Sequence, residues 1–426
     1  MTARPSASVL AIVILLAGFV IGAVRLSAQS QVDSLLDGSS LQDLWLHLND
    51  RDWEDIHTHY LDDTYYPVDV EWQGTRVRNA AVRVRGNASR NGHKPSLRLE
   101  FNRYVTGQTF FGLDAMTLNS FWLDPSMITN SLSMRLFRGM GIPAPRVAHV
   151  RLFAGGRREY AGVYGVTEEV SSSFLKANFG EDTGYLYEFK HQPTDTWSFQ
   201  DPGPRLGWYV PHFDAKTHKY DSVANLYMPI RDLVERINDA PQSDLESALA
   251  KYLDVNAFIT MVAVQNFVAQ TDGLVGSVGT NNFYLYRFTN RPFSVLIPWD
   301  QENAFGSNSV DLPPWWNMDS NVLASKIWSE PKYRARYFAA LLQVTSLAST
   351  DNWLGAEAAR EYQQIRDAVY ADPWAPYPVE QFESIHATIQ QYILQRPDYV
   401  RQYVAALAGE VSGSFPSLSL QGHRPK

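Results

Sequence analysis

The sequence predicts an α+β protein with two lobes, a sheet-rich first part and a mostly helical second part. Between residues 66 and 101, apolar and polar residues alternate, as in antiparallel strands with one face in water. From residue 226 onward, apolar residues recur every three or four positions, which is typical of helices. A polar, proline-rich stretch at 190–224 separates the two patterns. We therefore expect a β-rich lobe at 40–200 and a helical lobe at 201–408.

The composition narrows the class of protein. The chain has 426 residues, of which 45% are hydrophobic and 19% are charged, as in globular proteins. Its formal net charge of −8 argues against a nucleic-acid partner, which would require a basic surface. The sequence has no cysteine, so it offers neither thiol catalysis nor a cysteine metal site.

The N-terminal segment 1–28 predicts export. Val9–Val24 is an uninterrupted run of apolar residues and glycines, and Ala28 precedes Gln29 in a way that suits signal cleavage. The run is short for a spanning helix, so an uncleaved membrane anchor is the alternative. Either reading places the protein outside the cell, in a periplasm or at the cell surface. At the other end, residues 409–426 are expected to form a disordered tail.

The first lobe should contain several elements in order. Leu41–Asp55 has helical spacing, and the run from Tyr66 to Phe101 reads as an antiparallel meander. A helix is expected at Asp124–Met140, between Ser or Asp caps and closing glycines. The hairpin of Val147–Phe153 and Tyr160–Val166 should join the meander in one sheet.

The remaining elements are helices around one further hairpin. Asp254–Ala269 is expected to be a core helix in a separate helical lobe, and Phe283–Ile297 a hairpin. Val379–Leu407 should be a helix broken at Pro397. Other helices are expected at Ser171–Phe179, Leu226–Asn238, Asp244–Tyr252 and Asn352–Ala371, and a strand at Tyr185–Phe189.

The second hairpin is bracketed by residues suited to phosphoryl transfer. Asp272 follows the core helix, Asn282 precedes the hairpin, and Asp300 and Glu302 follow it. Protein kinases arrange their catalytic loop and metal site in this order. A carboxylate on a loop held by a rigid helix suits a general base, and hard oxygen ligands suit Mg²⁺. Each residue taken alone also fits a turn or a solvated acidic side chain.

A second group of residues could contact phosphates. Arg85, Gly86, Asn87 and Ser89 lie between two strands of the meander, where Gly86 permits close approach of an anion and the polar side chains can donate hydrogen bonds. Lys94 follows, and its ammonium could reach the α- and β-phosphates. Glu168, at a strand end, could orient Lys94 or hold a metal ion. The alternatives are an ordinary turn, a solvated lysine and an exposed acid.

Together these blocks resemble the CotH family, the atypical kinases similar to spore coat protein H. The resemblance covers about residues 66–306 and is strongest at its last block. The matching residues are Arg85-Gly86-Asn87 with Ser89, Lys94 and Phe101, Asp124, Gly141-Ile142-Pro143-Ala144-Pro145, Gly162-Val163-Tyr164 with Glu168, Asp272, Asn282-Phe283-Tyr284-Leu285-Tyr286, and Ile297-Pro298-Trp299-Asp300 with Phe305-Gly306.

The resemblance implies a kinase-like fold and ATP- and Mg²⁺-dependent phosphorylation of Ser or Thr in secreted or coat proteins. By position, Asp272 resembles the catalytic Asp, Asp300 the metal-binding Asp and Lys94 the phosphate-binding Lys. The chain departs from the family where Ala88 replaces a frequent Ser and where Gln301-Glu302 replaces a common second Asp. The extra methylene of Glu302 would change the metal geometry.

A different class of function stays open alongside the kinase. The chain could be a non-catalytic cell-surface or coat-assembly protein that keeps the fold and binds a partner. Export favours this reading, because ATP is scarce outside the cell, whereas retention of Lys94, Asp272, Asn282 and Asp300 favours the enzyme. A glycosidase using a carboxylate pair has no motif behind it. The expected partner is a protein substrate, with membrane contact only through an uncleaved anchor; the oligomeric state is not assigned.

Overall fold

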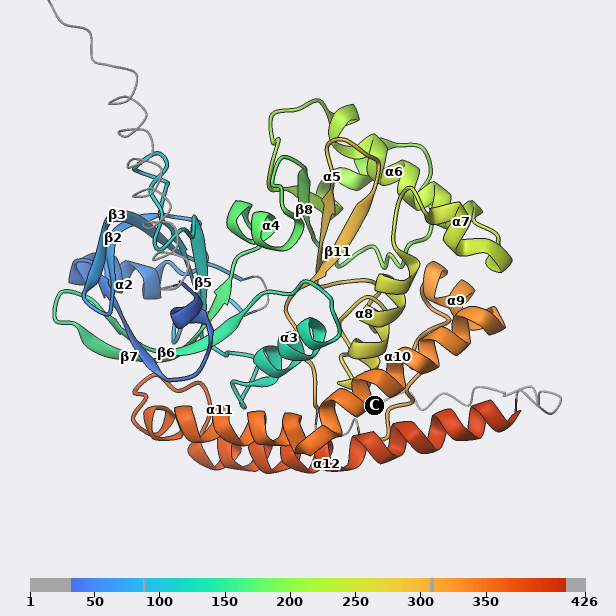
Figure 1. Ribbon diagram of the computed structural model, residues 1–426. Helices are drawn as coiled ribbons and strands as arrows, with labels where there is room; N and C mark the ends of the chain where they lie inside the picture. Colours follow the sequence, from blue (N-terminus) through green and yellow to red (C-terminus); the bar gives the residue numbers. More distant parts are fainter. Residues whose placement is uncertain (1–31, 87–88, 307–309, 411–426) are drawn as a thin grey trace, which may run out of the picture.

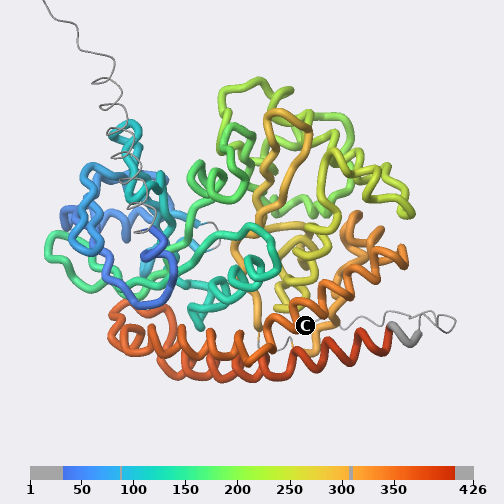
Figure 2. The backbone as a smooth tube through the Cα atoms, viewed as in Figure 1, coloured from blue at the N-terminus to red at the C-terminus, as the bar shows by residue number. Residues whose placement is uncertain are grey.

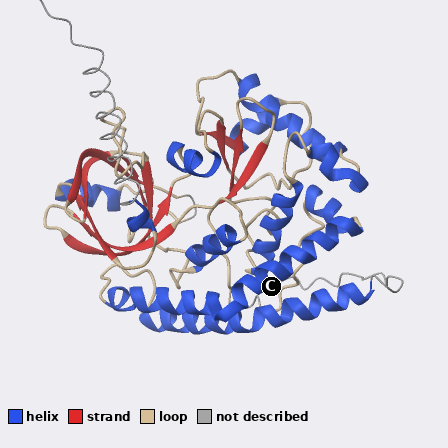
Figure 3. Ribbon diagram, in the orientation of Figure 1, coloured by secondary structure: helices blue, strands red, loops and turns tan. Residues whose placement is uncertain are grey.

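The computed structural model describes residues 32–86, 89–306 and 310–410. The predicted signal or anchor, Asn87 and Ala88, and the tail from residue 411 lie outside these ranges. The described chain forms a β-barrel beside a second sheet with its helices, and two long C-terminal helices run beneath both (Figure 1). The α+β class predicted from the sequence is therefore confirmed, and the strands form two separate groups (Figure 3).

Seven strands close into the barrel in the order β1-β2-β3-β4-β5-β7-β6. Neighbours are antiparallel except β1 and β6, whose parallel pairing closes the ring. The 66–101 meander and the 147–166 hairpin thus share one sheet, as predicted, but the sheet is closed rather than open. The strands are β1 (Gln42–His47), β2 (Tyr66–Trp72), β3 (Thr75–Val84), β4 (Leu97–Glu100), β5 (Ala115–Asn119), β6 (Val147–Ala154) and β7 (Glu159–Glu168).

The helix predicted at Leu41–Asp55 is wrong for its first half. Residues 42–47 form strand β1, and helix α2 (Asp50–Thr58) begins after Asn49, whose side chain accepts the Asp52 N–H. Leu44 and Leu46 alternate into the barrel core, where they are fully buried. Pairing with two strands that are distant in sequence therefore outweighs the helical spacing.

The second sheet has the order β11-β10-β8-β9. Its strand β8 comes from the part of the sequence assigned to the first lobe, yet Glu188 pairs with Tyr284 of β10. The change from the barrel to the second sheet therefore falls between β7 and α4, because Phe174 and Leu175 of α4 pack with residues of β8 and β10. The stretch at 190–224 contains β9, which pairs with β8. The elements are α3 (Thr129–Gly139), α4 (Ser172–Phe179), β8 (Tyr185–Phe189), β9 (Phe213–Ala215), β10 (Phe283–Arg287) and β11 (Ser294–Pro298).

Helices dominate the rest of the chain. The helix predicted to break at Pro397 instead continues through it, from Val379 to Glu410. Buried side chains on both sides of Pro397, Arg396 and Val400, hold the helix in place despite the lost hydrogen bond. The helices are α5 (Tyr209–His212), α6 (Val223–Asp239), α7 (Leu245–Leu249), α8 (Val255–Phe267), α9 (Val322–Ser329), α10 (Pro331–Ser349), α11 (Trp353–Tyr370) and α12 (Val379–Glu410).

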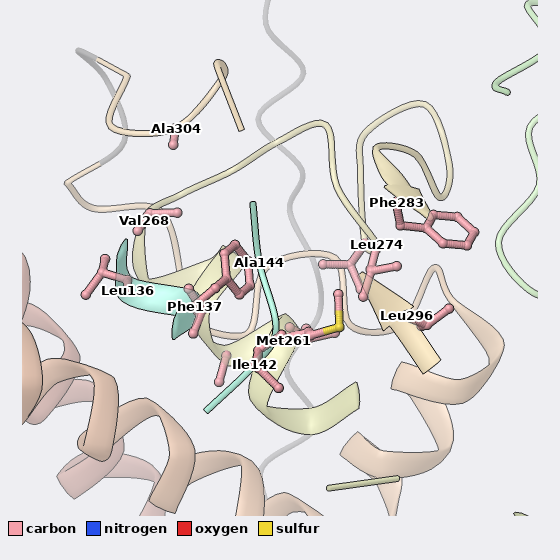
Figure 4. Packing of buried hydrophobic residues seen from close by; sticks show 14 of the residues in the cluster. Leu136, Phe137, Ile142, Ala144, Met261, Val268, Leu274, Phe283, Leu296 and Ala304 are labelled. Carbon is pink, nitrogen blue, oxygen red and sulfur yellow. The ribbon is translucent and has the colours of Figure 1, made fainter. Parts of the chain in front are cut away.

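The largest core cluster extends over α3, α8, the second sheet and the C-terminal helices. Figure 4 shows part of it, with Leu136 of α3 near Val268, just beyond the end of α8, and Met261 of α8 near Leu274. The loops that leave α8 and β11 are thus fixed to the same apolar core. The backbone trace shows α11 and α12 running side by side below the barrel and this core (Figure 2). Over the described ranges, no helix combines the length and apolarity that crossing a membrane requires.

Candidate active site

Asp272 is held on the loop that follows α8, the most completely buried helix of the central core. Its two carboxylate oxygens accept hydrogen bonds from the Nδ2 atoms of Asn281 and Asn282, each at 3.0 Å. Asn282 Nδ2 also bonds the backbone carbonyl of Asp272, at 2.8 Å. The two amides therefore fix the carboxylate of a half-buried aspartate, as catalysis by a positioned base requires.

The hairpin brings Asp300 to the same place. In the β10–β11 register Phe283 faces Pro298, and the Trp299 N–H extends the ladder to the Asn282 carbonyl at 3.0 Å. Asn282 and Asp300 thus leave the same end of the hairpin. Asp300 has a left-handed backbone with φ of 46°, and its carbonyl accepts from Gln270 Nε2 at 3.2 Å. Asn282 and Asp300, which the sequence places on either side of the hairpin, therefore lie close together in the structure.

The charges around Asp300 agree with the proximity that the hairpin imposes. The residue reaches solvent, but dense protein packing on the inner side of its carboxyl raises the pKa. Arg85 lowers this pKa and Asp272 raises it, so both charges act on Asp300 at short range. Glu302 shows a stronger effect, because burial and then Asp300 hold its pKa well above the usual range.

Glu302 is fixed from the barrel and from α3. The Nδ2 atom of Asn119, at the end of β5, donates to the Glu302 carboxylate. Thr129 Oγ1 donates to the Glu302 carbonyl at 3.2 Å, and Asn130 Oδ1 accepts the Gln301 N–H at 3.1 Å. Gln301 itself is fully buried, so the loop presents Asp300 and Glu302 and hides the residue between them.

The donor set fits Mg²⁺ in the manner of a nucleotide site. Asp272 raises the pKa of Asp300, Asp300 raises the pKa of Glu302, and Arg85 opposes both shifts, so three carboxylates act on one another at this place. Asn282 adds an amide oxygen. The described part of the chain contains no group of three His, Asp or Glu that could alone hold a metal. Mg²⁺ usually takes one or two carboxylates, with water and phosphates completing its octahedron.

Arg85 acts on this site from the end of β3, and Arg98 acts on Tyr284 beside it. The Arg85 guanidinium carbon lies 5.7 Å from the Trp299 ring centroid, next to Asp300 in the chain. Arg98, on β4, pairs through Nη1 with Glu169 at 2.9 Å. The pKa of Tyr284 is raised well above its usual value by burial and by Glu188 and Glu169, while Arg85 and Arg98 oppose the rise. The two arginines therefore surround a tyrosine two residues beyond Asn282.

Lys94 lies elsewhere, which corrects its predicted role at the phosphates. Its ammonium is fully buried and donates to Asp372 Oδ2 at 2.7 Å and to the Val163 carbonyl at 2.8 Å. Burial lowers the pKa of Lys94, and Asp372 opposes the shift. Asp372 also accepts the Val163 N–H at 3.0 Å. The pair joins the barrel to the loop after α11, a contact that local sequence could not reveal.

Glu168 also lies outside the cluster. Arg146 donates to the Glu168 carboxylate through Nε at 3.0 Å and Nη2 at 2.8 Å, so the partner of Glu168 is neither Lys94 nor a metal. Neighbouring residues of a strand point to opposite faces. The next residue, Glu169, accepts from Thr117 Oγ1 and pairs with Arg98 instead. The prediction selected the wrong member of an acidic pair.

The predicted glycine loop is braced by its own side chains. Gly86 has φ of 108°, a conformation that favours glycine, and a Cβ there would lie 2.5 Å from Ser89 Oγ. The Gly86 carbonyl accepts from Arg90 Nε at 2.8 Å. Ser89 and Gly86 thus form one turn following Arg85, whereas Asn87 falls outside the described residues. Asn91 bonds the Lys94 N–H at 2.8 Å and closes the loop.

Two functional candidates, Arg98 and Asn119, escaped the sequence analysis. Alternation along β4 could have found Arg98, since it stands between Leu97 and Leu99, which are fully buried. A partly exposed arginine flanked by core residues on a barrel strand points away from the core. Asn119 becomes recognisable only through its partner Glu302, which the fold supplies.

Comparison with known proteins agrees with this geometry. A family model described as CotH kinase protein matches residues 82–400. The inner spore coat protein H of Bacillus subtilis strain 168 is 23% identical over 373 residues, which is 85% of this chain and 97% of that protein.

Two solved structures share parts of the arrangement, at scores from which we draw no conclusion. The Helicobacter pylori proinflammatory kinase CtkA covers 76% of this chain and 97% of its own, with a TM-score of 0.30 and 10% identity. The HipA–HipB–operator DNA complex of Shewanella oneidensis MR-1 covers 69% and 60%, with a TM-score of 0.31 and 9% identity. The family match spans most of the sequence and confirms the resemblance seen in its motifs: the chain belongs to the CotH kinase protein family.

Proposed function

We propose that this protein is an exported kinase that transfers the γ-phosphoryl group of ATP to Ser or Thr hydroxyls of protein substrates. The observation that carries the proposal is the meeting of Asp272 and Asp300 through Asn282, at one end of the β10–β11 hairpin. Phosphoryl transfer demands positioning and charge stabilisation more than covalent help. A fixed base beside an acidic pair and two arginines supplies both.

Each residue has a distinct task in this proposal. Asp272 accepts the proton of the acceptor hydroxyl, and Asn281 and Asn282 hold its carboxylate in one orientation. Asp300 and Glu302, with the Asn282 amide oxygen, would hold Mg²⁺, which when bound neutralises charge on the phosphates. Arg85 and Arg98 would contact phosphate oxygens, with Arg98 kept in place by Glu169.

The barrel and the second sheet would act as the two lobes of the kinase, with the nucleotide between them. Arg85 and Arg98 come from the barrel, whereas Asp272 and Asp300 come from the other side. The N-terminal apolar run supports export, and the relative named inner spore coat protein H supports a location in a coat or at a surface. The acceptor would accordingly be a coat or surface protein.

Two aspartate variants test the assignment. Asp300→Asn should weaken Mg²⁺-dependent ATP binding together with turnover, because it removes a metal ligand. Asp272→Asn should leave ATP affinity nearly unchanged and lower kcat by about 10²–10⁴, the range for a positioned base. Binding is measured by calorimetry with and without Mg²⁺, and transfer by radiolabelled ATP. Asp319→Asn, at an exposed carboxylate beyond these loops, serves as the control.

The outcomes separate the proposal from a non-catalytic binding protein. Equal losses of ATP affinity in both variants would show that the division of roles is incorrect. Undetectable ATP binding in the unmutated protein would favour the coat-assembly function instead. The burial of Lys94 supports keeping that alternative, because it removes one cation expected at the phosphates.

A further inference from the structure

Arg396 is a fully buried charge on α12 whose donors are all directed to backbone carbonyls. Its Nε bonds the Phe267 carbonyl at 3.0 Å, and its Nη2 bonds the Asn266 carbonyl at 2.5 Å. Its Nη1 reaches the carbonyls of Val310 and Leu312 at 2.7 and 2.6 Å. The ion pairs found within the described ranges include none with Arg396. A buried guanidinium without a carboxylate is costly and persists only where its hydrogen bonds are satisfied.

The two sets of carbonyls belong to different parts of the active site. Asn266 and Phe267 form the last turn of α8, directly before the loop of Asp272. Val310 and Leu312 lie beyond the loop that presents Asp300 and Glu302. A single guanidinium therefore ties the support of the base to the chain that leaves the metal loop. Tyr392, one turn earlier on α12, adds a bond from its hydroxyl to the Phe267 carbonyl at 2.6 Å.

We call residues 310–317 the post-metal segment. Side-chain donors from other elements bond its backbone carbonyls along its whole length. The segment forms turns rather than a helix or strand, so its carbonyls need partners from elsewhere. Its remaining anchors are donors on three helices and one of its own amides. Tyr399 Oη bonds the Asp311 carbonyl at 2.5 Å, Tyr337 Oη bonds the Pro314 carbonyl, and Asn266 Nδ2 bonds the Trp316 carbonyl at 3.4 Å.

The far end of the segment contacts the loop of the base. Asn317 Nδ2 donates to the carbonyls of Val275 and Gly276, both at 2.8 Å, a few residues after Asp272. The post-metal segment thus contacts the loop of Asp272 at one end and is fixed by Arg396 at the other.

We propose that Arg396 is a positioning residue: it holds the post-metal segment against the loop of Asp272 and thereby fixes the surface on which the protein acceptor lies. The role of the protein acceptor rests on the proposed kinase function, whereas the hydrogen bonds of Arg396 do not depend on it. Arginine is required because its planar fork serves four carbonyls at once, whereas a lysine ammonium has three donors at one point.

The test is Arg396→Lys in the full chain, with Arg401→Lys as its matched control. Arg401 lies on the same helix, is exposed, and bonds Asp398 and Ser349 instead of the segment. We expect kcat with casein as the acceptor probe to fall by about 10- to 100-fold in Arg396→Lys, because small displacements near reacting groups are costly. The KM for ATP should stay within about twofold. Arg401→Lys should match the unmutated protein in both.

Hydrogen–deuterium exchange provides a readout that needs no activity. Peptides covering the post-metal segment should exchange faster in Arg396→Lys than in the unmutated protein, while barrel peptides stay unchanged. Unchanged exchange in the segment would overturn the proposal, as would equal losses in ATP affinity and kcat. If the unmutated protein transfers no phosphate, the proposed function fails and the exchange result still decides the role of Arg396. If Arg396→Lys does not fold, Tyr399→Phe should show the same change around Asp311, and its absence would overturn the proposal.

Discussion

The barrel contributes two cations to ion pairs, Lys94 with Asp372 and Arg98 with Glu169. Lys94 and Arg98 are only four residues apart in the chain, yet the two pairs have different roles. The side chains of Lys94 and Asp372 are both 0% exposed, whereas Arg98 is 27% exposed and Glu169 is 5% exposed. The first pair is sealed where the loop after α11 meets the barrel. The second is partly exposed, and its Arg98 lowers the pKa of Tyr284, two residues beyond Asn282.

The contrast teaches that access, and not residue type, separates a structural cation from a functional one. Lys94 has the chemistry of a phosphate ligand, but its three hydrogen-bonding directions face Asp372, Val163 and the ring of Tyr164. Arg98 retains a surface toward solvent while Glu169 fixes its orientation. A cation that is held yet accessible is what phosphate recognition requires.

The largest effect should follow from breaking the sealed pair. Asp372→Ala leaves the Lys94 ammonium buried with only the Val163 carbonyl, and loss of one partner of a buried pair costs about 3–5 kcal/mol. Lys94→Met should cost less, because Asp372 keeps the N–H groups of Val163 and Trp374. Urea unfolding measures both.

Glu159→Gln, in a pair with Arg157 that is exposed on both sides, is the control and should lie within error of the unmutated protein. If Asp372→Ala lost no more unfolding free energy than this control, the pair would not be the structural tie that its burial indicates. If Lys94→Met kept its stability and lost ATP affinity, the role predicted from the sequence would be restored.

Breaking the Arg98–Glu169 pair should affect kcat/KM for ATP more than the free energy of unfolding. Arg98→Met removes a cation facing the site and should lower kcat/KM for ATP by about 10²–10³, the range for losing a charge-stabilising donor. Its unfolding free energy should fall by less than that of Asp372→Ala. Arg98 also pairs with Glu100, at 3.0 Å, and Arg103 pairs with the same carboxylate at 3.4 Å. Arg103→Met is therefore the matched control and should leave kcat/KM unchanged. Equal activities for the two variants would contradict a role for Arg98 at the phosphates.

The same contrast explains what the sequence could predict. Asp272, Asn282 and Asp300 were identified because one helix and one hairpin carry all three, so chain order nearly determines their proximity. Lys94 and Asp372 are 278 residues apart, and no local pattern signals their contact. Glu168 and Glu169 could be distinguished only by knowing which face of β7 meets Arg146.

The fold shows the same division. Alternating residues predicted five of the seven barrel strands and their common sheet, because half-buried strands impose a period of two. Strand β5 was not predicted, since four of its five residues are buried and no alternation marks it. Closure of the barrel depends on β1, whose sequence has helical spacing, and on its parallel pairing with β6. The membership of β8 in the second sheet likewise arises from pairing with β10, which follows only after β9 and the helices α5 to α8.

The smallest effect should come from Glu302, a partly exposed acid whose pKa is raised despite the opposing charge of Arg85. Burial and Asp300 raise its pKa in the folded protein, so the folded state binds the proton more tightly than the unfolded state. Without metal, stability should therefore fall as pH rises from the ordinary carboxyl pKa through the raised value. Glu302→Gln removes this cost and should raise Tm by about 2 °C at pH 8 in EDTA, with less gain at pH 5.

Adding Mg²⁺ should reverse the order of the two Tm values, because the metal takes the place of the proton between Asp300 and Glu302. The unmutated protein should then gain more Tm than Glu302→Gln at pH 8, since binding to the folded state alone stabilises it. Scanning calorimetry at both pH values with Mg²⁺ or EDTA measures the difference. An equal Mg²⁺-dependent gain in the two proteins would remove Glu302 from the metal site and leave Asp300 and Asn282 as its protein ligands.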